Sequence, residues 1–394
     1  MKLLIVTNLF PSSVEPGRGL FNQQQFLALA RHCELRVVSP VPWFPRGRWL
    51  RKLRPWSRYA EVPSRETIAG LEVHHPRYLV IPKLARWLHA FTYRLGIDRT
   101  VTALRREFAF DAILATWAYP DVVASVGIAA RIGVPVVAKV HGSDLNVLAQ
   151  GRLRRRMIAG ALRRCAAVVA VSSGLKQHVV NLGVPEDRVT VIPNGVDVGR
   201  FRPLDRFVCR RRLGLPEQGR RVVFIGHLTP VKGLNVLLEA LSDLPAEVSL
   251  SLVGEGEERG RLEALAAAQG LRDRVTFVGA RPHDEVPLWM NASDIVCLPS
   301  LNEGCPNVVL EALACGRRVV ATAVGGIPDL LSDPRAGRLV PPGNTRALAE
   351  ALQECLGRTG TPEDSRQASA LPGWSESAGQ VARIVEEVLR GKAA

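Results

Sequence analysis

Short apolar runs separated by mixed polar stretches follow one another along the first half of the chain. Runs that are apolar throughout, rather than alternating, are typical of strands buried on both faces of a parallel sheet. We therefore expect a helix at Asn22–Arg31 and strands at Leu3–Thr7, Leu35–Ser39, Ala112–Ala115, Val134–Val140 and Ala167–Val171. Strands that alternate with helices in this way predict an α/β domain with a doubly wound parallel sheet.

The second half repeats this architecture without repeating the sequence. Its last helix is expected at Ala378–Leu389, and its strands at Arg221–Ile225, Ser249–Val253, Val275–Val278, Ile295–Leu298 and Arg318–Ala321. A polar, basic stretch at Phe201–Arg221 contains prolines and glycines, which interrupt helices and strands. We therefore predict domains at residues 1–200 and 201–375, with residues 376–394 forming a helix that packs back on the first domain.

The expected fold indicates where functional residues should lie. Ligands of open α/β sheets bind beyond the carboxyl ends of the strands. With two such sheets, we expect two Rossmann-like domains that face a central cleft, with the functional residues in the loops that follow the strands. A length of 394 residues is long for a single core and agrees with two domains.

The composition is that of a globular protein. Hydrophobic residues make up 47% and charged residues 23%, and the longest apolar runs are too short to cross a bilayer. The apolar start ends at Thr7 without a small-residue cleavage site, which favours a buried first strand over a signal peptide. Seven cysteines, without a CxxC pair or zinc-ligand spacing, favour unpaired thiols in a reducing cytoplasm.

The formal charge of +15 lies entirely in the first half of the chain. Residues 1–200 carry a net charge of +16, and residues 201–394 carry −1. A basic half is compatible with nucleic acid, anionic lipid or an acidic acceptor as a partner. The alternative is an arginine-rich composition that only keeps the helices solvated.

The first loop with candidate chemistry follows the strand at Arg221–Ile225. The sequence there is GHLTPVKG (226–233), which places Lys232 near the start of a helix. A helix N-terminus favours anions, and an ammonium adds a full positive charge. The loop therefore suits a phosphate, although a solvated lysine is equally consistent with this loop alone.

The second such loop, PSLNEGCPNVVLEALA (299–314), follows the fourth strand of the second half. We expect Pro306 in the first turn of a helix, with Glu303 before the helix and Glu311 inside it. Backbone N–H groups around Asn307–Leu310 would then be available to an anion. Glu311 stands among apolar residues, where an unpaired carboxylate is unfavourable and ribose hydroxyls would be suitable donors. The alternative is a Glu311 that reaches water at the top of the helix.

The E-x7-E spacing of Glu303 and Glu311 resembles glycosyltransferase family 4, whose members have the GT-B fold and transfer sugars with retention of configuration. Other segments resemble this family in the family's order: KVHGSDLN (139–146), VSSGLKQHVVNLGVP (171–185), VIPNGVDVGRF (191–201), GHLTPVKG (226–233) and EGCPNVVLEALACGRRVVATAVGGIPDLL (303–331). The resemblance covers residues 1–20 and 139–345. The combination is far more specific than any one motif.

The resemblance implies a donor site for a nucleoside-diphosphate sugar, with uridine the commoner base and guanosine the next. It implies that Glu311 binds the ribose hydroxyls, Glu303 the hydroxyls of the donor sugar and Lys232 the diphosphate. His141 is expected to face the sugar near its anomeric carbon, so the expected catalytic residues are His141, Glu303 and Lys232. The other donor-binding residues implied by the resemblance are Gly17, Gly19, His227, Arg281, Gly304, Cys305, Pro306, Asn307, Val308 and Val309.

The chain departs from the family in two loops. Many members carry arginine where this chain has His227, so Lys232 is the preferred ligand of the diphosphate. The loop Pro16–Gly19 lacks the double glycine common in the family. No Asp-x-Asp occurs in the sequence, and we expect neither a metal nor another cofactor. Our working hypothesis is a front-face departure in which the leaving phosphate helps to deprotonate the acceptor.

The acceptor is less well defined by the sequence. In family 4 the N-terminal domain takes the acceptor, which is often lipid-linked. Residues 42–58, PWFPRGRWLRKLRPWSR, interleave aromatic and basic side chains from Trp43 to Arg58, which suits an anionic membrane surface. A second basic cluster comprises Arg152, Arg154, Arg155, Arg156, Arg163 and Arg164. We expect a cytoplasmic enzyme, peripheral on the inner face of the membrane, that extends a glycan or lipid-linked acceptor for cell-surface polysaccharide or glycolipid; a solvated basic loop is the alternative.

Three other functions stay open at this point. A nucleotide-sugar epimerase or a phosphorylase would share the architecture and differ in its product. A basic module that binds nucleic acid or a membrane would need no reaction, and no nucleic-acid fold signature is present in the sequence. An NAD-dependent oxidoreductase would need GxGxxG after the first strand, where Asn8-Leu9-Phe10-Pro11 stands instead.

Overall fold

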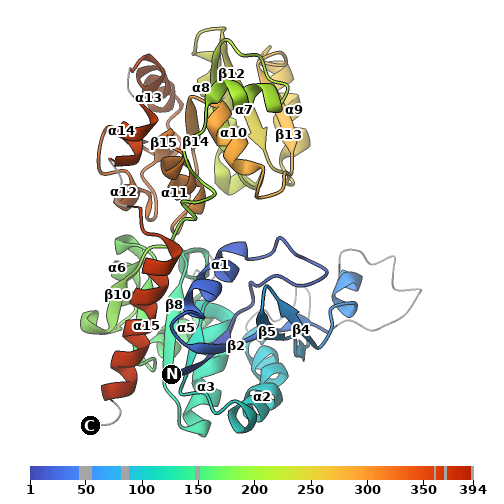
Figure 1. The fold of residues 1–394 in the computed structure, drawn as a ribbon, viewed down its shortest axis with the longest axis vertical. Helices are drawn as coiled ribbons and strands as arrows, with labels where there is room; N and C mark the ends of the chain where they lie inside the picture. The colour runs from blue at the N-terminus through green and yellow to red at the C-terminus, as the bar shows by residue number, and fades with distance from the viewer. Residues whose placement is uncertain (44–55, 81–87, 147–150, 359–360, 368–370, 392–394) are drawn as a thin grey trace. The chain divides into compact units, whose positions relative to one another are not determined.

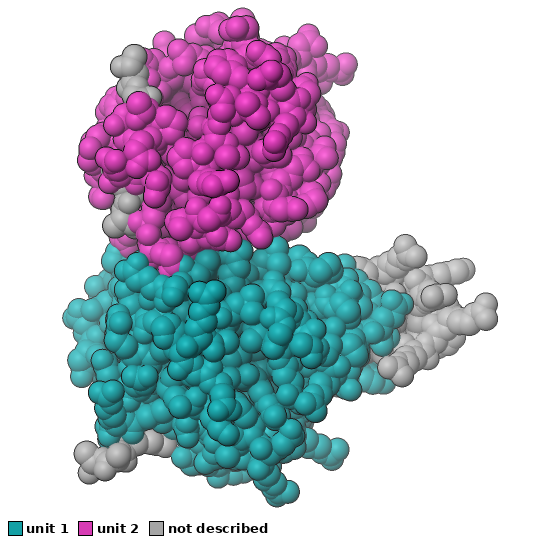
Figure 2. Space-filling model, viewed as in Figure 1, with its two compact units in different colours: residues 1–194, 374–394 teal, residues 195–373 magenta. Residues whose placement is uncertain are grey.

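The computed structural model of the chain describes residues 1–43, 56–80, 88–146, 151–358, 361–367 and 371–391. The chain forms two compact units, coloured separately in Figure 2. The N-terminal unit comprises Met1–Asn194 and Trp374–Ala394, and the C-terminal unit comprises Gly195–Gly373. A boundary at residue 200 was predicted. Val196 forms a β-bridge with Gly373, and both belong to the C-terminal unit.

An eight-stranded sheet is the centre of the N-terminal unit within the described residues. In chain order its strands are β1 (Lys2–Val6), β2 (Glu34–Val38), β4 (Arg65–Ile68), β5 (Leu71–His74), β7 (Ala112–Ala115), β8 (Val136–Val140), β9 (Ala167–Ala170) and β10 (Val189–Val191). They lie in the order β10-β9-β8-β7-β1-β2-β5-β4, with every neighbouring pair parallel except β4 and β5. A separate parallel pair joins β3 (Val41–Pro42) to β6 (Arg77–Tyr78).

Helices cover both faces of this sheet (Figure 1). They are α1 (Leu20–Leu29), α2 (His89–Glu107), α3 (Val123–Ile132), α4 (Ser143–Asn146), α5 (Arg152–Leu162), α6 (Ser173–Asn181) and α15 (Trp374–Gly391), with short turns η2 (Trp56–Ala60), η3 (Ala118–Val122) and η5 (Glu186–Arg188). Leu3 and Ile5 of β1 share one buried cluster with Phe26 of α1 and Val381 of α15. Leu4, which alternates with them, is also fully buried. Burial on both faces explains why the strands are apolar throughout.

The C-terminal unit contains a second, fully parallel sheet in the described residues. Its strands are β11 (Arg220–Ile225), β12 (Val248–Val253), β13 (Val275–Gly279), β14 (Ile295–Leu298), β15 (Arg318–Thr322) and β16 (Gly337–Val340), in the order β13-β12-β11-β14-β15-β16. Its helices are α7 (Arg206–Arg212), α8 (Leu234–Ser242), α9 (Arg259–Ala268), α10 (Val286–Ala292), α11 (Asn307–Ala314), α12 (Ile327–Leu330), α13 (Thr345–Gly357) and α14 (Pro362–Gln367), with the turn η6 (Pro230–Lys232). The predicted α/β class with two doubly wound parallel sheets is confirmed.

Each sheet has one place at which the direction of chain progression reverses. In the N-terminal unit the chain runs outward from β1 to β2 and later returns to β7 on the other side of β1. In the C-terminal unit it runs from β11 to β12 and β13, and returns to β14 on the other side of β11. Loops that leave such a point diverge and leave room for a ligand beyond the carboxyl ends of the strands. The loops after β1 and β7, and after β11 and β14, are therefore where a site is expected.

Candidate active site

The loops after β11 and β14 are fastened to each other by their backbones. The N–H of Leu301 donates to the carbonyl of Val231 at 2.7 Å. Gly233 has a φ of +62°, and a Cβ on it would lie 2.3 Å from the carbonyl oxygen of Pro299. Only glycine combines this φ with so close an approach. The two candidate loops, distant in sequence, therefore form one structure.

This fastening brings Lys232 and Glu303 together. Lys232 Nζ lies 2.6 Å from Glu303 Oε1, and the Ser300 hydroxyl donates to the same oxygen at 2.7 Å. Both charged side chains are largely buried, with 21% and 11% exposed. Gly325, after β15, packs against the backbone of Glu303 so closely that a Cβ would lie 2.1 Å from its carbonyl oxygen. The structure thus places a cation and a carboxylate side by side at the reversal point of the sheet.

Helix α11 continues directly from this loop. It begins at Asn307, and Pro306 precedes it as the N-cap, so the prediction that Pro306 lies in the first turn is wrong. An extended ψ of 114° keeps Pro306 outside the helix. Glu311 lies inside the helix, as expected, and its side chain is 16% exposed. Its Oε1 lies 3.2 Å from Nε2 of His283, so Glu311 is neither unpaired nor freely solvated.

His283 is a site residue that sequence reasoning missed. It follows β13, and its Nδ1 lies 2.9 Å from Nη1 of Arg200. The ring of Phe201 meets the imidazole edge-on, with centroids 5.3 Å apart. A histidine in the loop after a parallel strand was the available signal, but only the fold shows that this loop reaches α11.

The other predicted residues of the C-terminal unit surround these groups or lie at its surface. His227 is exposed at the end of β11. Arg281 donates to the Val278 carbonyl at 3.3 Å and lies 3.9 Å from Glu285. The carbonyl of Gly304 accepts from Gly326 at 2.6 Å. Cys305 and Val309 are buried, while Asn307 and Val308 are half-buried. None of the seven cysteines forms a disulfide.

In the N-terminal unit, His141 follows β8 and is 8% exposed. The N–H groups of His141 and Gly142 donate to Asp144 Oδ1 at 3.2 and 2.8 Å, which fixes the turn. The ring of Trp117 stacks on the imidazole with centroids 5.5 Å apart. Burial, reinforced by the positive charge of Lys139, holds the pKa of His141 well below its ordinary value. His141 is therefore neutral, and its Nε2 has no hydrogen-bond partner among the described residues.

A second set of buried polar groups lies at the reversal point between β1 and β7. Asp121 is fully buried and accepts the N–H of Asn8 at 3.0 Å. Burial raises the pKa of Asp121 to about 8, so its carboxyl is mainly protonated at neutral pH. The side-chain oxygens of Asn8 and Thr116 have no hydrogen-bond partner in the part of the chain that the structure describes. Sequence reasoning did not select Asp121, which follows β7 within the turn η3.

The two glycines predicted in the loop after β1 differ in their surroundings. Gly19 has a φ of +65° and precedes α1, and a Cβ on it would lie 2.5 Å from the Leu9 carbonyl oxygen. Gly17 has open space around the position of a Cβ. Between them, Arg18 donates to the Asn8 carbonyl at 2.9 Å and pairs with Glu15 at 3.1 Å. Gly19 is thus required by the local fold, whereas Gly17 is not.

The basic segments predicted for a membrane are only partly described. Residues 44–55 of the segment 42–58 lie outside the described residues. Trp43 is 54% exposed, and Arg58 pairs with Glu15 at 2.8 Å. The arginines of α5 that reach the surface include Arg152, Arg155 and Arg156. Within the described ranges, every helix is too short or too polar to traverse a bilayer.

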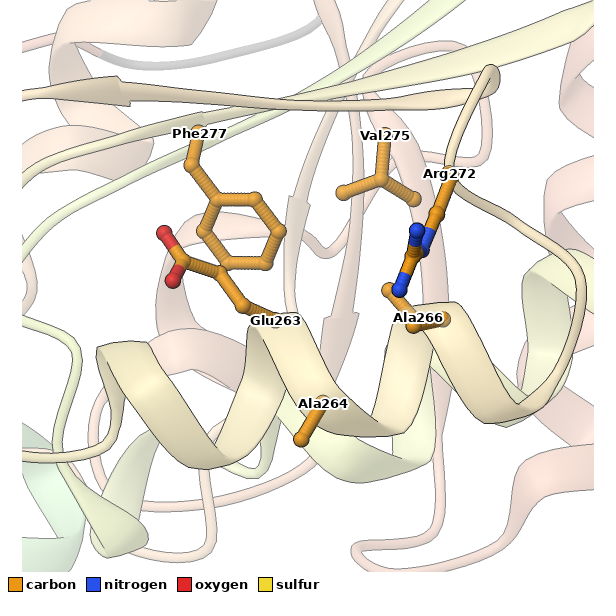
Figure 3. A pocket seen from close by; sticks show the side chains of 7 residues that line it. Glu263, Ala264, Ala266, Arg272, Val275 and Phe277 are labelled. Atoms are coloured by element: carbon orange, nitrogen blue, oxygen red, sulfur yellow. The ribbon is translucent and has the colours of Figure 1, made fainter.

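Two hollows in the C-terminal unit lie away from these groups. One, of about 370 Å³, opens between α9 and β13, where Glu263 and Phe277 face each other in Figure 3. The other, of about 390 Å³, lies at the amino ends of β11 and β15. Its Arg206 pairs with Asp294, and its Arg318 donates to backbone carbonyls. Neither hollow contains a residue of the predicted site.

Comparison with known proteins supplies the family. Residues 28–200 match the family model described as Glycosyltransferase Family 4, and residues 219–358 match that of Glycosyl transferases group 1. The putative teichuronic acid biosynthesis glycosyltransferase TuaC of Bacillus subtilis is 30% identical over 89% of this chain and 88% of the relative. A D-inositol 3-phosphate glycosyltransferase of Frankia alni is 32% identical over 78% of this chain and 80% of the relative.

A solved structure supports the fold. The crystal structure of Anabaena HepE in complex with UDP covers 100% of this chain, and the chain covers 98% of HepE, with a TM-score of 0.69 and 22% identity. At this identity the likeness shows the fold alone, and it confirms the GT-B fold expected from the sequence. The chain is a glycosyltransferase and belongs to glycosyltransferase family 4.

Proposed function

We propose that the chain moves a sugar from a UDP-sugar, with retention of configuration, to a glycan or lipid-linked acceptor in cell-surface polysaccharide or glycolipid biosynthesis. The observation that carries the proposal is the Lys232–Glu303 pair, at 2.6 Å, in the loop that leads into α11. The complex of HepE with UDP supports the nucleotide, and the teichuronic acid named for TuaC supports a polysaccharide product.

The C-terminal unit would bind the donor. In this assignment Lys232 meets the diphosphate, and the partial positive charge at the start of α11 adds to its field. Glu303 takes sugar hydroxyls, and Glu311 takes the hydroxyls of the ribose. Lys232 already balances the charge of Glu303, so both side chains are held in place before the donor arrives. Fixed charges aimed at the leaving group are the largest source of catalysis in reactions of this type.

No metal is assigned to the reaction. Negative charge grows on the β-phosphate as the glycosidic bond breaks, and Lys232 and the N-terminus of α11 would stabilise it. In a front-face departure the freed phosphate oxygen takes the proton of the attacking hydroxyl on the same face of the sugar. This route gives retention without a carboxylate as a covalent nucleophile.

The N-terminal unit would contribute His141 to the donor sugar. Its imidazole is neutral because burial lowers its pKa, and a neutral imidazole both accepts and donates a hydrogen bond. Trp117 fixes one ring face, and the Nε2 atom lacks a partner among the described residues. A sugar hydroxyl would supply that partner, which gives His141 a role near the reacting carbon.

Attachment to an anionic membrane is the finer part of the proposal. The exposed Trp43 and the exposed arginines of α5 supply an aromatic group and positive charge. We expect flotation with vesicles of anionic lipid at low salt and its loss at high salt. Absence of flotation at low salt would remove the membrane from the proposal and leave the reaction untouched.

Product analysis tests the proposed reaction. The enzyme is incubated with UDP-sugars and a panel of glycan and lipid-linked acceptors, and NMR records the anomeric configuration of the product from its first appearance. We expect a glycoside with the configuration of the donor, together with UDP. Inverted configuration would contradict retention. An epimerised nucleotide sugar or a sugar phosphate would show an epimerase or a phosphorylase.

A further inference from the structure

Three side chains from separate segments of the C-terminal unit form a continuous series of polar contacts. Arg200 lies before α7, His283 lies in the loop after β13, and Glu311 lies on α11. Nη1 of Arg200 is 2.9 Å from Nδ1 of His283, and Nε2 of the same ring is 3.2 Å from Oε1 of Glu311. The imidazole therefore connects a guanidinium to the carboxylate assigned to the ribose.

The chemistry of the two neighbours fixes the proton on the imidazole. A guanidinium can only donate, so Nδ1 must accept and carries no hydrogen. An ionised carboxylate can only accept, so Nε2 carries the hydrogen and donates to Glu311. The arrangement therefore requires the neutral Nε2–H tautomer of His283. A histidine protonated on both nitrogens would turn an N–H toward Arg200 and lose that contact.

Arg200 and His283 are also held in place by residues outside these three. The N–H groups of Gly199 and Arg200 both donate to Asp197 Oδ1 at 3.1 Å, which fixes the turn that presents the guanidinium. Phe201 is buried and packs edge-on against the imidazole. The imidazole is thus fixed by a ring contact and by two hydrogen bonds of opposite direction.

This arrangement orders the two oxygens of Glu311. Oε1 is occupied by His283, whereas Oε2 accepts no hydrogen bond from the described residues. A carboxylate with one oxygen held presents the other in a defined direction, which reduces the entropy lost when a ligand binds. A vicinal diol offers two O–H donors, and a carboxylate oxygen accepts more than one hydrogen bond.

We propose that His283 is a positioning residue for the donor: it turns Oε2 of Glu311 toward the ribose hydroxyls, and Arg200 sets the tautomer that does so. The inference rests on the proposed donor site. It adds a consequence for specificity, because the contribution of His283 is realised through the ribose hydroxyls and is reduced when one of them, such as the 2′-hydroxyl, is missing. A ribonucleoside diphosphate is therefore expected to bind more tightly than its 2′-deoxy analogue, and the difference is expected to depend on His283.

The test compares the dissociation constants of UDP and 2′-deoxy-UDP by calorimetry. In His283→Leu, we expect the Kd of UDP to rise about tenfold, which corresponds to one charge-assisted hydrogen bond, and that of 2′-deoxy-UDP to rise less than about threefold. His283→Gln keeps a donor and an acceptor on one side chain, and should restore most of the preference for UDP. Arg200→Leu should act like His283→Leu, whereas the control Arg346→Leu, 90% exposed on α13, should change neither Kd.

The outcomes separate the inference from the proposed function. If His283→Leu raises both Kd values equally, or changes neither, the preference for UDP over 2′-deoxy-UDP stays as in the wild type. His283 would then have at most a structural role, and the inference would be overturned. If His283→Leu is poorly folded, the folded Gln and Arg200 variants decide the question by the same ratio. If the wild type binds UDP and Glu311→Ala abolishes the binding, but the ratio of the Kd values of 2′-deoxy-UDP and UDP does not change in these variants, only the inference fails. If the wild type binds no nucleoside diphosphate, both fail.

Discussion

The two units present different kinds of polar group at corresponding places in their sheets. At the reversal point of the C-terminal sheet, Lys232 and Glu303 form an ion pair, and Glu311 is paired nearby with His283. At that of the N-terminal sheet, Asp121 is buried with its pKa raised, and His141 at the neighbouring strand is buried with its pKa lowered. The first site places its acidic and basic side chains in contact with one another, whereas burial in the second shifts the pKa values of Asp121 and His141 toward their neutral forms.

This difference matches the two halves of a glycosyl transfer. A nucleoside diphosphate is an anion, and fixed charges of both signs are suited to it and to its hydroxyls. A sugar is uncharged, and neutral donors and acceptors in a desolvated place are suited to it, since hydrogen bonds there are not weakened by water. The comparison supports the proposed roles, in which the charged site binds the nucleotide and, through Glu303, hydroxyls of the sugar, while the neutral site faces the reacting carbon.

The largest effect is expected at the charged site. Lys232→Ala removes the side-chain cation assigned to the leaving diphosphate, together with the ion pair that it forms with Glu303. We expect kcat/KM to fall about 10³-fold, at the upper end for loss of one preorganised charge in a transition state. Steady-state kinetics with Lys232→Arg as the matched variant checks it. Activity of Lys232→Ala within a few-fold of wild type would remove Lys232 from the reaction.

At the neutral site the expected effect is smaller and falls on a different constant. His141→Ala should lower kcat about 10²-fold, because the sugar loses a hydrogen-bonding group near the reacting carbon. The Kd of UDP should stay within about threefold of wild type, because free UDP carries no sugar for His141 to touch. If His141→Ala lost UDP binding instead, the assignment of the nucleotide to the C-terminal unit alone would be wrong.

The sequence predicted those features that depend on neighbouring residues, and it missed those that depend on contacts between distant ones. Strands such as Ala112–Ala115 and Ile295–Leu298 were predicted with the bounds that the structure shows, because burial on both faces leaves an unbroken apolar run. The antiparallel strands β4 and β5 were missed, since their polar positions mask the apolar ones. The last helix is longer at both ends than predicted.

In the candidate site, too, local patterns predicted local features but not contacts between distant residues. Glu303 and Glu311 were placed before and inside a helix because a local spacing and a proline define them. The His283–Glu311 contact joins residues 28 positions apart through the loop after β13, and no local pattern records it. Asp121 is exceptional only because it is buried, and burial follows from the whole unit. Pairing and desolvation, which distinguish the two sites, are therefore the properties that the sequence hides.

The raised pKa of Asp121 should make the stability of the protein depend on pH. The pKa of Asp121 is raised to about 8, so between about pH 4 and 8 the folded state keeps a proton that the unfolded state releases. The contribution of Asp121 to the free energy of unfolding therefore falls as pH rises through this window. Asp121→Asn cannot release a proton, and its Tm relative to wild type should rise by about 2–4 °C from pH 6.5 to 8.

The opposite contribution of His141 is present in both proteins and cancels in their Tm difference. Its pKa is lowered in the folded state, so the unfolded state binds the extra proton, and this costs stability only as pH falls below about 6.5. Scanning calorimetry at several pH values gives the comparison. A Tm difference between Asp121→Asn and wild type that does not change from pH 6.5 to 8 would show that the carboxyl is ionised in the folded protein.

The smallest expected effect concerns metal. Because Lys232 and the N-terminus of α11 are assigned the charge of the leaving group, EDTA should change kcat by less than about twofold. The same assay with added Mg²⁺ or Mn²⁺ is the control. A loss of activity with EDTA that Mg²⁺ restores would add a cation to the charged site and reduce the part assigned to Lys232.

The most direct test of the account is the binding of UDP, measured by calorimetry, to the wild type, Glu311→Ala and His141→Ala. We expect Glu311→Ala to raise the Kd about 100-fold, the equivalent of two hydrogen bonds to a charged acceptor, and His141→Ala to leave it within about threefold. Equal and small effects of the two substitutions would contradict the assignment of the nucleotide to the C-terminal unit.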